Sequence, residues 1–210
     1  MKKRRENKTS SGFSIIELLI ATTVTLVVLS LVSTLFSKSL STRQRESSRT
    51  DALTAAQAAL NVMSREISNS GYGLVNNGIV FADSNQQKLH FLSNITNTNN
   101  VVTDPRENIT YFFEPNTQSI LRYDANGNGI NSPQTSIVIN RISSVNFLYF
   151  DYTDSNSTPT TNNTPTFKTG RIRVTITVKL ENVQGQTNNQ NVVLISDVTL
   201  RNSNYMLQQY

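Results

Sequence analysis

The sequence predicts an α+β protein in which one long N-terminal helix is followed by a mainly antiparallel β-sheet domain. Three observations predict this fold. Residues 13–36 form an uninterrupted apolar run, residues 53–67 carry an apolar stripe at helical spacing, and residues 171–181 alternate strictly between apolar and polar. With 210 residues, of which 37% are hydrophobic, the chain can build about one domain with its own core in addition to the helix.

The apolar run contains 24 residues from Phe13 to Phe36, with Glu17 as its one charge and without Pro or Gly. As a helix it would extend roughly 36 Å, which exceeds the thickness of about 30 Å of a bilayer core. We therefore expect a transmembrane helix. Basic residues precede it, so residues 1–12 are expected in the cytoplasm and the rest of the chain across the membrane.

The positive charge of the protein is concentrated before this helix. The net charge is +5, and residues 1–12 alone carry +4, which leaves +1 for the remainder. Such a balance does not imply nucleic-acid binding. Because the chain has no cysteine, it has neither disulfides nor thiolate metal ligands, and the exported domain must be held together by packing.

Two other kinds of N-terminal segment share features with this one. A secretory signal peptide has an apolar region of about 7 to 15 residues that ends in a small-residue cleavage site, and this run is longer. An uncleaved anchor explains the length and the flanking charges but does not explain Glu17. A carboxylate near the bilayer centre costs about 2.5 to 3.5 kcal/mol, and less near the interface. Glu17 is therefore expected either to have a partner or to lie at headgroup depth.

Residues 11–21, SGFSIIELLIA, resemble the processing motif of type IV prepilins: a basic leader, a Gly, an aromatic residue and a Glu four residues beyond it. The resemblance implies that a prepilin peptidase cleaves after Gly12. It also implies that Phe13 becomes the N-methylated first residue of the mature chain, and that Glu17, then its fifth residue, acts in assembly.

The helix is predicted to continue past the apolar run to about Asn69. Residues 37–51 are polar on every face, which is typical of a solvated stalk or of a marginally stable helix. From Leu53 the apolar residues recur at steps of three and four, which predicts a face packed on the following sheet. They are Leu53, Ala56, Leu60, Met63 and Ile67. Gly71 and Gly73 are expected to end the helix.

Residues 71–210 are predicted to form the β-rich domain, with the periplasmic half of the long helix, 37–70, before it. The clearest strand is 171–181, and after a polar turn it should pair antiparallel with 190–201. Two segments rich in Asn, Thr, Ser and Pro, 94–108 and 153–168, are expected to be surface loops. Weaker patterns predict strands at 79–82, 88–92, 109–113, 119–123 and 145–152.

The order of these elements is similar to that of PilW-type minor pilins and the related GspJ-type minor pseudopilins. The likeness implies a low-copy, pilin-like subunit that helps initiate or cap a type IV pilus. It also implies partners: the prepilin peptidase, other minor and major pilins, and the inner-membrane assembly platform. The subunit would start as a single-pass inner-membrane protein with a periplasmic C-terminal domain and end in the pilus or at the cell surface. Unlike many major pilins, the chain has Thr34 where a helix-kinking Pro is common, and it lacks a C-terminal cysteine pair.

Two alternative functions remain open from the sequence. The first is a minor pseudopilin of a type II secretion system, which would be built in the same way. The second, from a different class, is an extracytoplasmic binding or adhesive domain that the helix only tethers to the membrane.

Few residues suggest chemistry. Asp124, Asn126 and Asn128 in DANGNG match the start of a calcium loop, but the twelfth loop position is Thr135 instead of a bidentate Glu, so a hairpin turn is favoured. His90, the single histidine, is expected at an ordinary strand position. No nucleophile lies near a base, and no phosphate loop occurs, so we predict neither an enzyme nor a cofactor beyond the calcium alternative.

Overall fold

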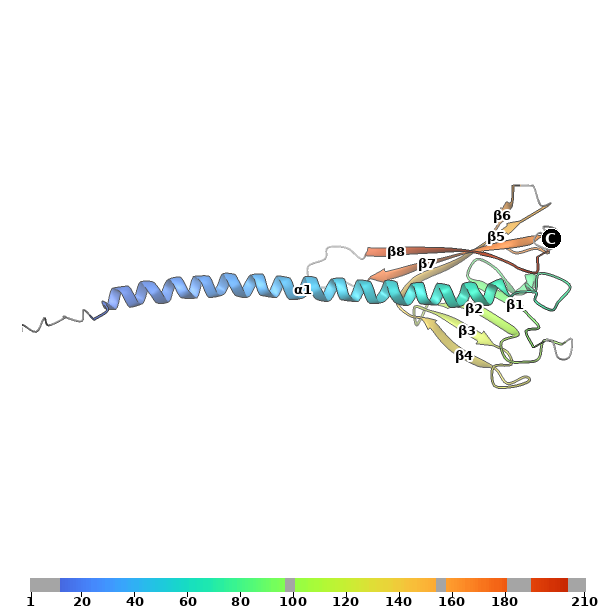
Figure 1. Cartoon of the computed structure of the whole chain (residues 1–210), viewed down its shortest axis with the longest axis horizontal. Helices are drawn as coiled ribbons and strands as arrows, with labels where there is room; N and C mark the ends of the chain where they lie inside the picture. Colours follow the sequence, from blue (N-terminus) through green and yellow to red (C-terminus); the bar gives the residue numbers. More distant parts are fainter. Residues whose placement is uncertain (1–11, 97–100, 154–157, 181–189, 204–210) are drawn as a thin grey trace, which may run out of the picture. The chain divides into compact units, whose positions relative to one another are not determined.

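Helix α1 spans Ile15–Ser68 and is the longest element of the protein. The computed structural model describes residues 12–96, 101–153, 158–180 and 190–203. By its internal contacts the chain divides into two units, Met1–Glu46 and Ser47–Tyr210, and α1 contributes to both (Figure 1). The predicted long helix is thus confirmed, beginning two residues later and ending one residue earlier than expected.

The end of α1 is defined by glycines. Gly71 and Gly73 have φ values of 79° and 69°, a left-handed conformation that only glycine adopts without strain, so the predicted stop is confirmed. A Cβ on Gly71 would lie 2.3 Å from the carbonyl oxygen of Asn76. The side-chain amide of Asn202 also donates a hydrogen bond to the Gly71 carbonyl, which further fixes this turn.

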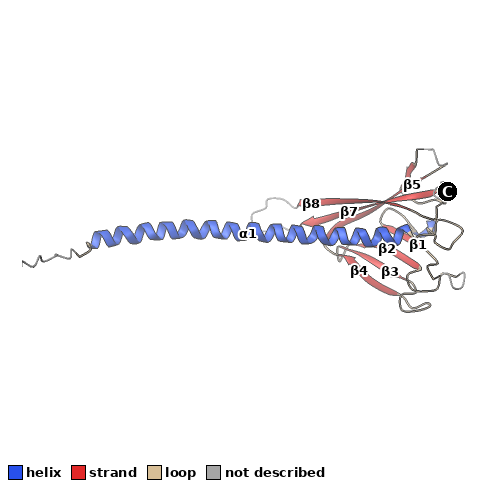
Figure 2. Ribbon diagram, in the orientation of Figure 1, coloured by secondary structure: helices blue, strands red, loops and turns tan. Residues whose placement is uncertain are grey.

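Two antiparallel sheets follow the helix, which confirms the α+β class and divides the predicted β domain into two layers (Figure 2). The first, here called sheet A, has the order β1-β2-β3-β4 and consists of β1 (Lys88–Leu92), β2 (Asn108–Glu114), β3 (Ser119–Asp124) and β4 (Gln134–Ile139). The second, sheet B, has the order β6-β5-β7-β8 and consists of β5 (Ile142–Asp151), β6 (Thr160–Asn162), β7 (Thr169–Leu180) and β8 (Gln190–Thr199).

Most strand predictions are confirmed, including the antiparallel pairing of β7 with β8. The strand predicted at 79–82 is wrong. Ile79 makes a single bridge to Phe91, and the chain then forms a short 3-10 helix, η1 (Phe81–Asp83), closed by the hydrogen bond from Asp83 N to Val80 O. Strand β4 was not predicted, and β6 lies inside the segment expected to be a loop.

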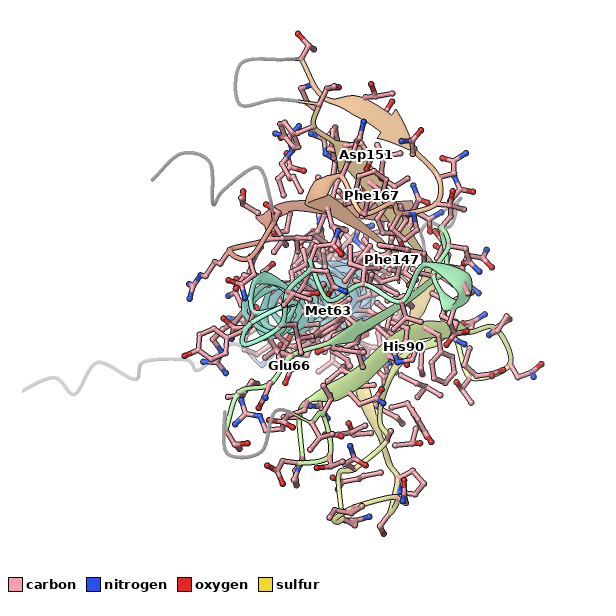
Figure 3. All side chains as sticks on the ribbon, turned by 90° about the vertical axis from the view of Figure 1, so that its right-hand side faces the viewer. Met63, Glu66, His90, Phe147, Asp151 and Phe167 are labelled. Atoms are coloured by element: carbon pink, nitrogen blue, oxygen red, sulfur yellow. The ribbon has the colours of Figure 1, made fainter. Side chains whose placement is uncertain are left out.

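The core of the second unit lies around the C-terminal part of α1. Ala56, Leu60, Met63 and Ile67 are buried, as the apolar stripe predicted, and Leu53 is half-buried. In the view along the helix, Met63 lies in the crowded centre, with Phe147 of β5 on one side of it (Figure 3). The stripe is therefore covered by strands of the same chain.

A polar contact ties α1 to sheet A. Oε2 of Glu66 accepts hydrogen bonds from the Tyr111 hydroxyl at 2.5 Å and from Nε of Arg122 at 2.9 Å. Arg122 also approaches the Asp124 carboxylate at 3.4 Å. Burial first, and Glu66 second, raise the pKa of Tyr111 well above its usual range. The charges of Glu66 and Arg122 are tolerated in this largely buried position because they are paired and hydrogen-bonded.

Candidate functional site

The predicted cleavage position lies directly before the first helical turn. Gly12, Phe13 and Ser14 precede α1, and the Ser14 carbonyl accepts the N–H groups of Glu17 and Leu18 at 3.0 and 3.1 Å. Gly12 and Phe13 are exposed, and apart from its chain neighbours no described residue has an atom within 4 Å of a Cβ placed on Gly12. No described residue therefore covers the predicted cleavage position. Residues 1–11, the rest of the predicted leader, lie outside the described residues.

Glu17 lies in the first turn of α1, and its side chain is exposed. Within the described part of the chain, no hydrogen bond or ion pair engages its carboxylate. The N-terminal end of a helix carries a partial positive charge, which favours a carboxylate at this position. Phe13 is four residues earlier. If the helix extended to Phe13, the backbone nitrogens of Phe13 and Glu17 would be about 6 Å apart along the helix axis.

The apolar side chains of the same segment are also exposed. Large apolar residues between Phe13 and Phe36 have exposed fractions from 52% to 84%. A window of 18 residues in α1 reaches a mean hydropathy of 2.5, and none of it is buried, so α1 is long and apolar enough to cross a membrane. A signal sequence near the N-terminus can also reach this hydropathy over 18 residues, whereas the core helix of a soluble protein would be mostly buried.

Most hydroxyl groups within the apolar segment are satisfied by the helix itself. Five side chains donate to carbonyl oxygens three or four residues earlier, at distances of 2.7 to 3.1 Å: Thr22, Thr23, Thr25, Ser30 and Thr34. Such bonds allow Ser and Thr to enter an apolar environment without leaving a donor unpaired. Glu17, in contrast, has no such internal partner.

The DANGNG segment forms the turn between β3 and β4, as favoured from the sequence. Asp124 is buried, and its two oxygens accept the backbone N–H groups of Asn126 at 3.1 Å and Arg106 at 2.8 Å. The Asn126 oxygen accepts the N–H of Asn131, and the Asn128 amide donates to a backbone carbonyl. Asp124, Asn126 and Asn128 thus use these hydrogen bonds to hold the turn together.

His90 lies in β1, at the ordinary strand position that was predicted, yet its surroundings were not predicted. Its Nδ1 lies 2.9 Å from Oδ2 of Asp83, and its Nε2 lies 2.8 Å from Oδ1 of Asn108. Asp83 had been placed just beyond a predicted strand and Asn108 at the end of a predicted loop. The spacing of residues 83, 90 and 108 follows no helical or strand period, so no sequence pattern predicts that their side chains meet.

Comparison of the chain with models of protein families, with curated proteins and with solved structures returned no match.

Proposed function

We propose that the protein is a minor pilin, which after cleavage at Gly12 packs by its N-terminal helix into a type IV pilus and helps initiate or cap its assembly. The observation that carries this proposal is Glu17. It is the one charged side chain in the exposed apolar segment 13–36, and it has no partner among the described residues. Its spacing from Gly12 and Phe13 resembles that of the prepilin motif.

The proposed mechanism pairs two charges that neither the helix nor the lipid can satisfy. Cleavage between Gly12 and Phe13 would create an amine at the start of the helix. The amine of an incoming subunit would meet Glu17 of a subunit already packed, while the apolar faces of the two helices contact each other. In a low-dielectric environment, removing one member of such a pair costs about 3 to 5 kcal/mol, because the other charge remains unpaired.

The hydroxyls that the helix satisfies support this proposal by contrast, because Glu17 carries the one charge of the segment and has no such bond among the described residues. The exposed apolar side chains support it in a second way, since such a surface is stable only when lipid or other helices cover it. The prepilin peptidase, other minor and major pilins and the inner-membrane assembly platform are the proposed partners.

The test of this mechanism is crosslinking of the protein to partner pilins in the membrane, at matched expression. We expect Glu17→Ala to lower crosslinking and fibre assembly about tenfold or more, which corresponds to 1.4 kcal/mol. Crosslinking and assembly of Glu17→Asp should lie between those of Glu17→Ala and those of the wild type. Asp51→Ala, which removes an exposed carboxylate farther along the same helix, serves as the matched control and should have no effect. Unchanged crosslinking in Glu17→Ala would refute the pairing.

Two further measurements distinguish the proposal from its alternatives. Intact-mass analysis of the protein from membranes should show a methylated Phe13 as the first residue, whereas an N-terminus at Met1 would favour a tethered binding domain. Deletion of the gene should abolish surface fibres and twitching. If enzyme export is lost while the fibres remain, the protein is a pseudopilin of a type II secretion system.

A further inference from the structure

An open groove of about 510 Å³ lies on the face of sheet A that points away from the core. This volume is within the range of about 300 to 1,000 Å³ that is usual for ligand sites. Strands β1, β2 and β3 form its floor, and the chain around η1 forms one wall. All of these elements belong to the second unit, so the groove is independent of how the N-terminal helix is used.

The strand register decides which side chains form the floor. Phe112 lies opposite Lys88, and Thr110 lies opposite both His90 and Tyr123, so these five side chains share one face. The residues between them point the other way and are fully buried, as at Leu89, Ile109 and Tyr111. Phe112 and Tyr123 remain half-exposed and give the groove an apolar, aromatic floor.

The polar groups at one side of the floor hold one another in place. Asp83 binds Lys88 through one carboxylate oxygen and His90 through the other, and the second ring nitrogen of His90 contacts Asn108. The Lys88 ammonium, followed by His90, holds the pKa of Asp83 below its usual range although partial burial opposes this shift. The carboxylate is therefore ionised at neutral pH, and its charge is compensated within the cluster.

Several hydrogen-bonding groups of the groove are left over. Nδ2 of Asn108 and the hydroxyl of Tyr123 have no hydrogen-bond partner among the described residues. Lys88 uses one of its three donors on Asp83. These groups lie around the aromatic side chains of Phe112 and Tyr123 and are carried by paired strands, which favours a preorganised site.

The chemistry of the groove excludes several kinds of ligand. A strongly charged ligand would find no net charge to pair with, since Asp83 is matched by Lys88. An extended peptide cannot add to the floor as a strand, because β2 is hydrogen-bonded on both sides and β1 already receives Val80 N–H on its outer edge. Catalysis by the Asp83–His90 pair would need a nucleophile at Nε2, where Asn108 lies instead.

We propose that this groove binds a neutral saccharide, with the apolar C–H face of a sugar ring stacked on Tyr123, the ring edge beside Phe112, and its hydroxyl groups on Asn108 and Lys88. A pyranose combines an apolar face with donors and acceptors around its edge, which matches an aromatic floor bordered by compensated polar groups. The groove is open to solvent, so a longer glycan can extend beyond the sugar ring that it holds.

The experiment is a titration of the isotopically labelled full-length protein, in a zwitterionic detergent that contains no sugar, with cellotriose, maltotriose and N,N′,N″-triacetylchitotriose, all of which are neutral. We expect at least one of these probes to produce saturable shifts in backbone amide resonances confined to β1, β2 and β3. Tyr123→Ala should weaken the affinity about tenfold or more, as expected for the loss of a stacking floor. Tyr123→Phe, which keeps the ring, should weaken it less.

The matched control is Tyr72→Ala, which removes a tyrosine that is 51% exposed on a loop outside the groove and should leave the titration unchanged. A well-dispersed amide spectrum of each variant would show that its sheets are intact. The proposal is overturned if none of the three trisaccharides produces saturable shifts. It is also overturned if binding survives Tyr123→Ala unchanged, or if a carboxylated trisaccharide binds and the neutral ones do not.

Discussion

The two halves of α1 are both rich in apolar residues, yet they relate to the rest of the chain in opposite ways. Up to Phe36 the large apolar side chains are more than half exposed, whereas Ala56, Met63 and Ile67 are completely buried. The difference follows from their patterns. Apolar residues on all faces need a surrounding partner, while a stripe at steps of three and four needs a partner on one side only. Hydropathy thus indicates that a segment favours an apolar environment, and the periodicity of its apolar residues indicates how many faces of the helix need to be covered.

Between these two parts of α1 lie residues 37–51, which are neither apolar on all faces nor marked by an apolar stripe. No side chain of residues 37–51 is buried, and the division between the two units, at Glu46, falls inside it. A helix without a covered face is held by its own hydrogen bonds alone, and these are marginal in water. Comparing this segment with residues 53–67 therefore separates the stability that backbone hydrogen bonds give to the helix from the stability that packing adds.

The largest expected difference concerns amide hydrogen exchange in the detergent-solubilised protein. Amides of residues 53–67 should exchange only when the second unit opens, with a free energy that approaches the global value of about 5 to 15 kcal/mol. Amides of residues 37–51 should exchange at a free energy near zero, because local fraying suffices. Mass spectrometry of peptides from both segments measures this. Equal protection would mean that something covers the stalk.

A core truncation should affect the second unit alone. Met63→Ala removes a completely buried side chain from between the sheets and should lower the free energy of unfolding of that unit by about 2 to 5 kcal/mol. The measurement is denaturant unfolding followed by the sheet signal. Val62→Ala, one residue away and 40% exposed, is the matched control and should cost much less. Leu26→Ala in the first half should leave this transition where it is.

Loss of the polar tie between α1 and sheet A should have a somewhat smaller effect. Glu66→Ala leaves the Tyr111 hydroxyl and the Arg122 guanidinium without their shared acceptor, which should cost about 1 to 3 kcal/mol in the same unfolding measurement. The double variant Glu66→Leu with Arg122→Met removes both charges and should recover part of this loss. If the single and double variants are equally unstable, the tie acts through packing instead of charge.

The smallest predicted effect is alkaline. Burial raises the pKa of Tyr149 above its usual range, so the folded state keeps the proton that the unfolded state loses above pH 10. The stabilisation is complete below the unfolded pKa of 10 and is lost as the pH rises further. Relative to Tyr149→Phe, the wild type should lose about 1 kcal/mol of unfolding free energy by pH 11. Parallel pH profiles of the two proteins would contradict this.

The elements that could be predicted from sequence are those in which one pattern dominates. Strand β7 alternates from Arg171 to Leu180, and the stripe of α1 keeps helical spacing, because each buries one continuous face. Strand β4 was missed because its first four residues are exposed and only Ile139 is buried, so no alternation marks it. Strand β6 has three residues, Thr160–Asn162, with no apolar side chain.

The candidate sites differ in the same way. Gly12, Phe13 and Glu17 lie within six consecutive residues, so their relation can be read directly from the chain. Asp83, His90 and Asn108 meet only because β1 and β2 pair in register and η1 folds back beside β1. Pairing of that kind depends on the whole sheet, and no local spacing encodes it.

The way in which α1 is fastened to the second unit has a mechanical consequence. Beside the apolar stripe, the helix is held by bonds to both sheets: Glu66 to Tyr111 and Arg122 in sheet A, and Ser64 to Ser196 in β8 of sheet B, at 2.9 Å. The Ser68 carbonyl also accepts the backbone N–H of Arg201 at 3.2 Å. A tensile force along the helix would load these attachments together, in shear, instead of peeling them apart one by one. The protein should therefore resist extension up to a single rupture force and then release the helix in one step.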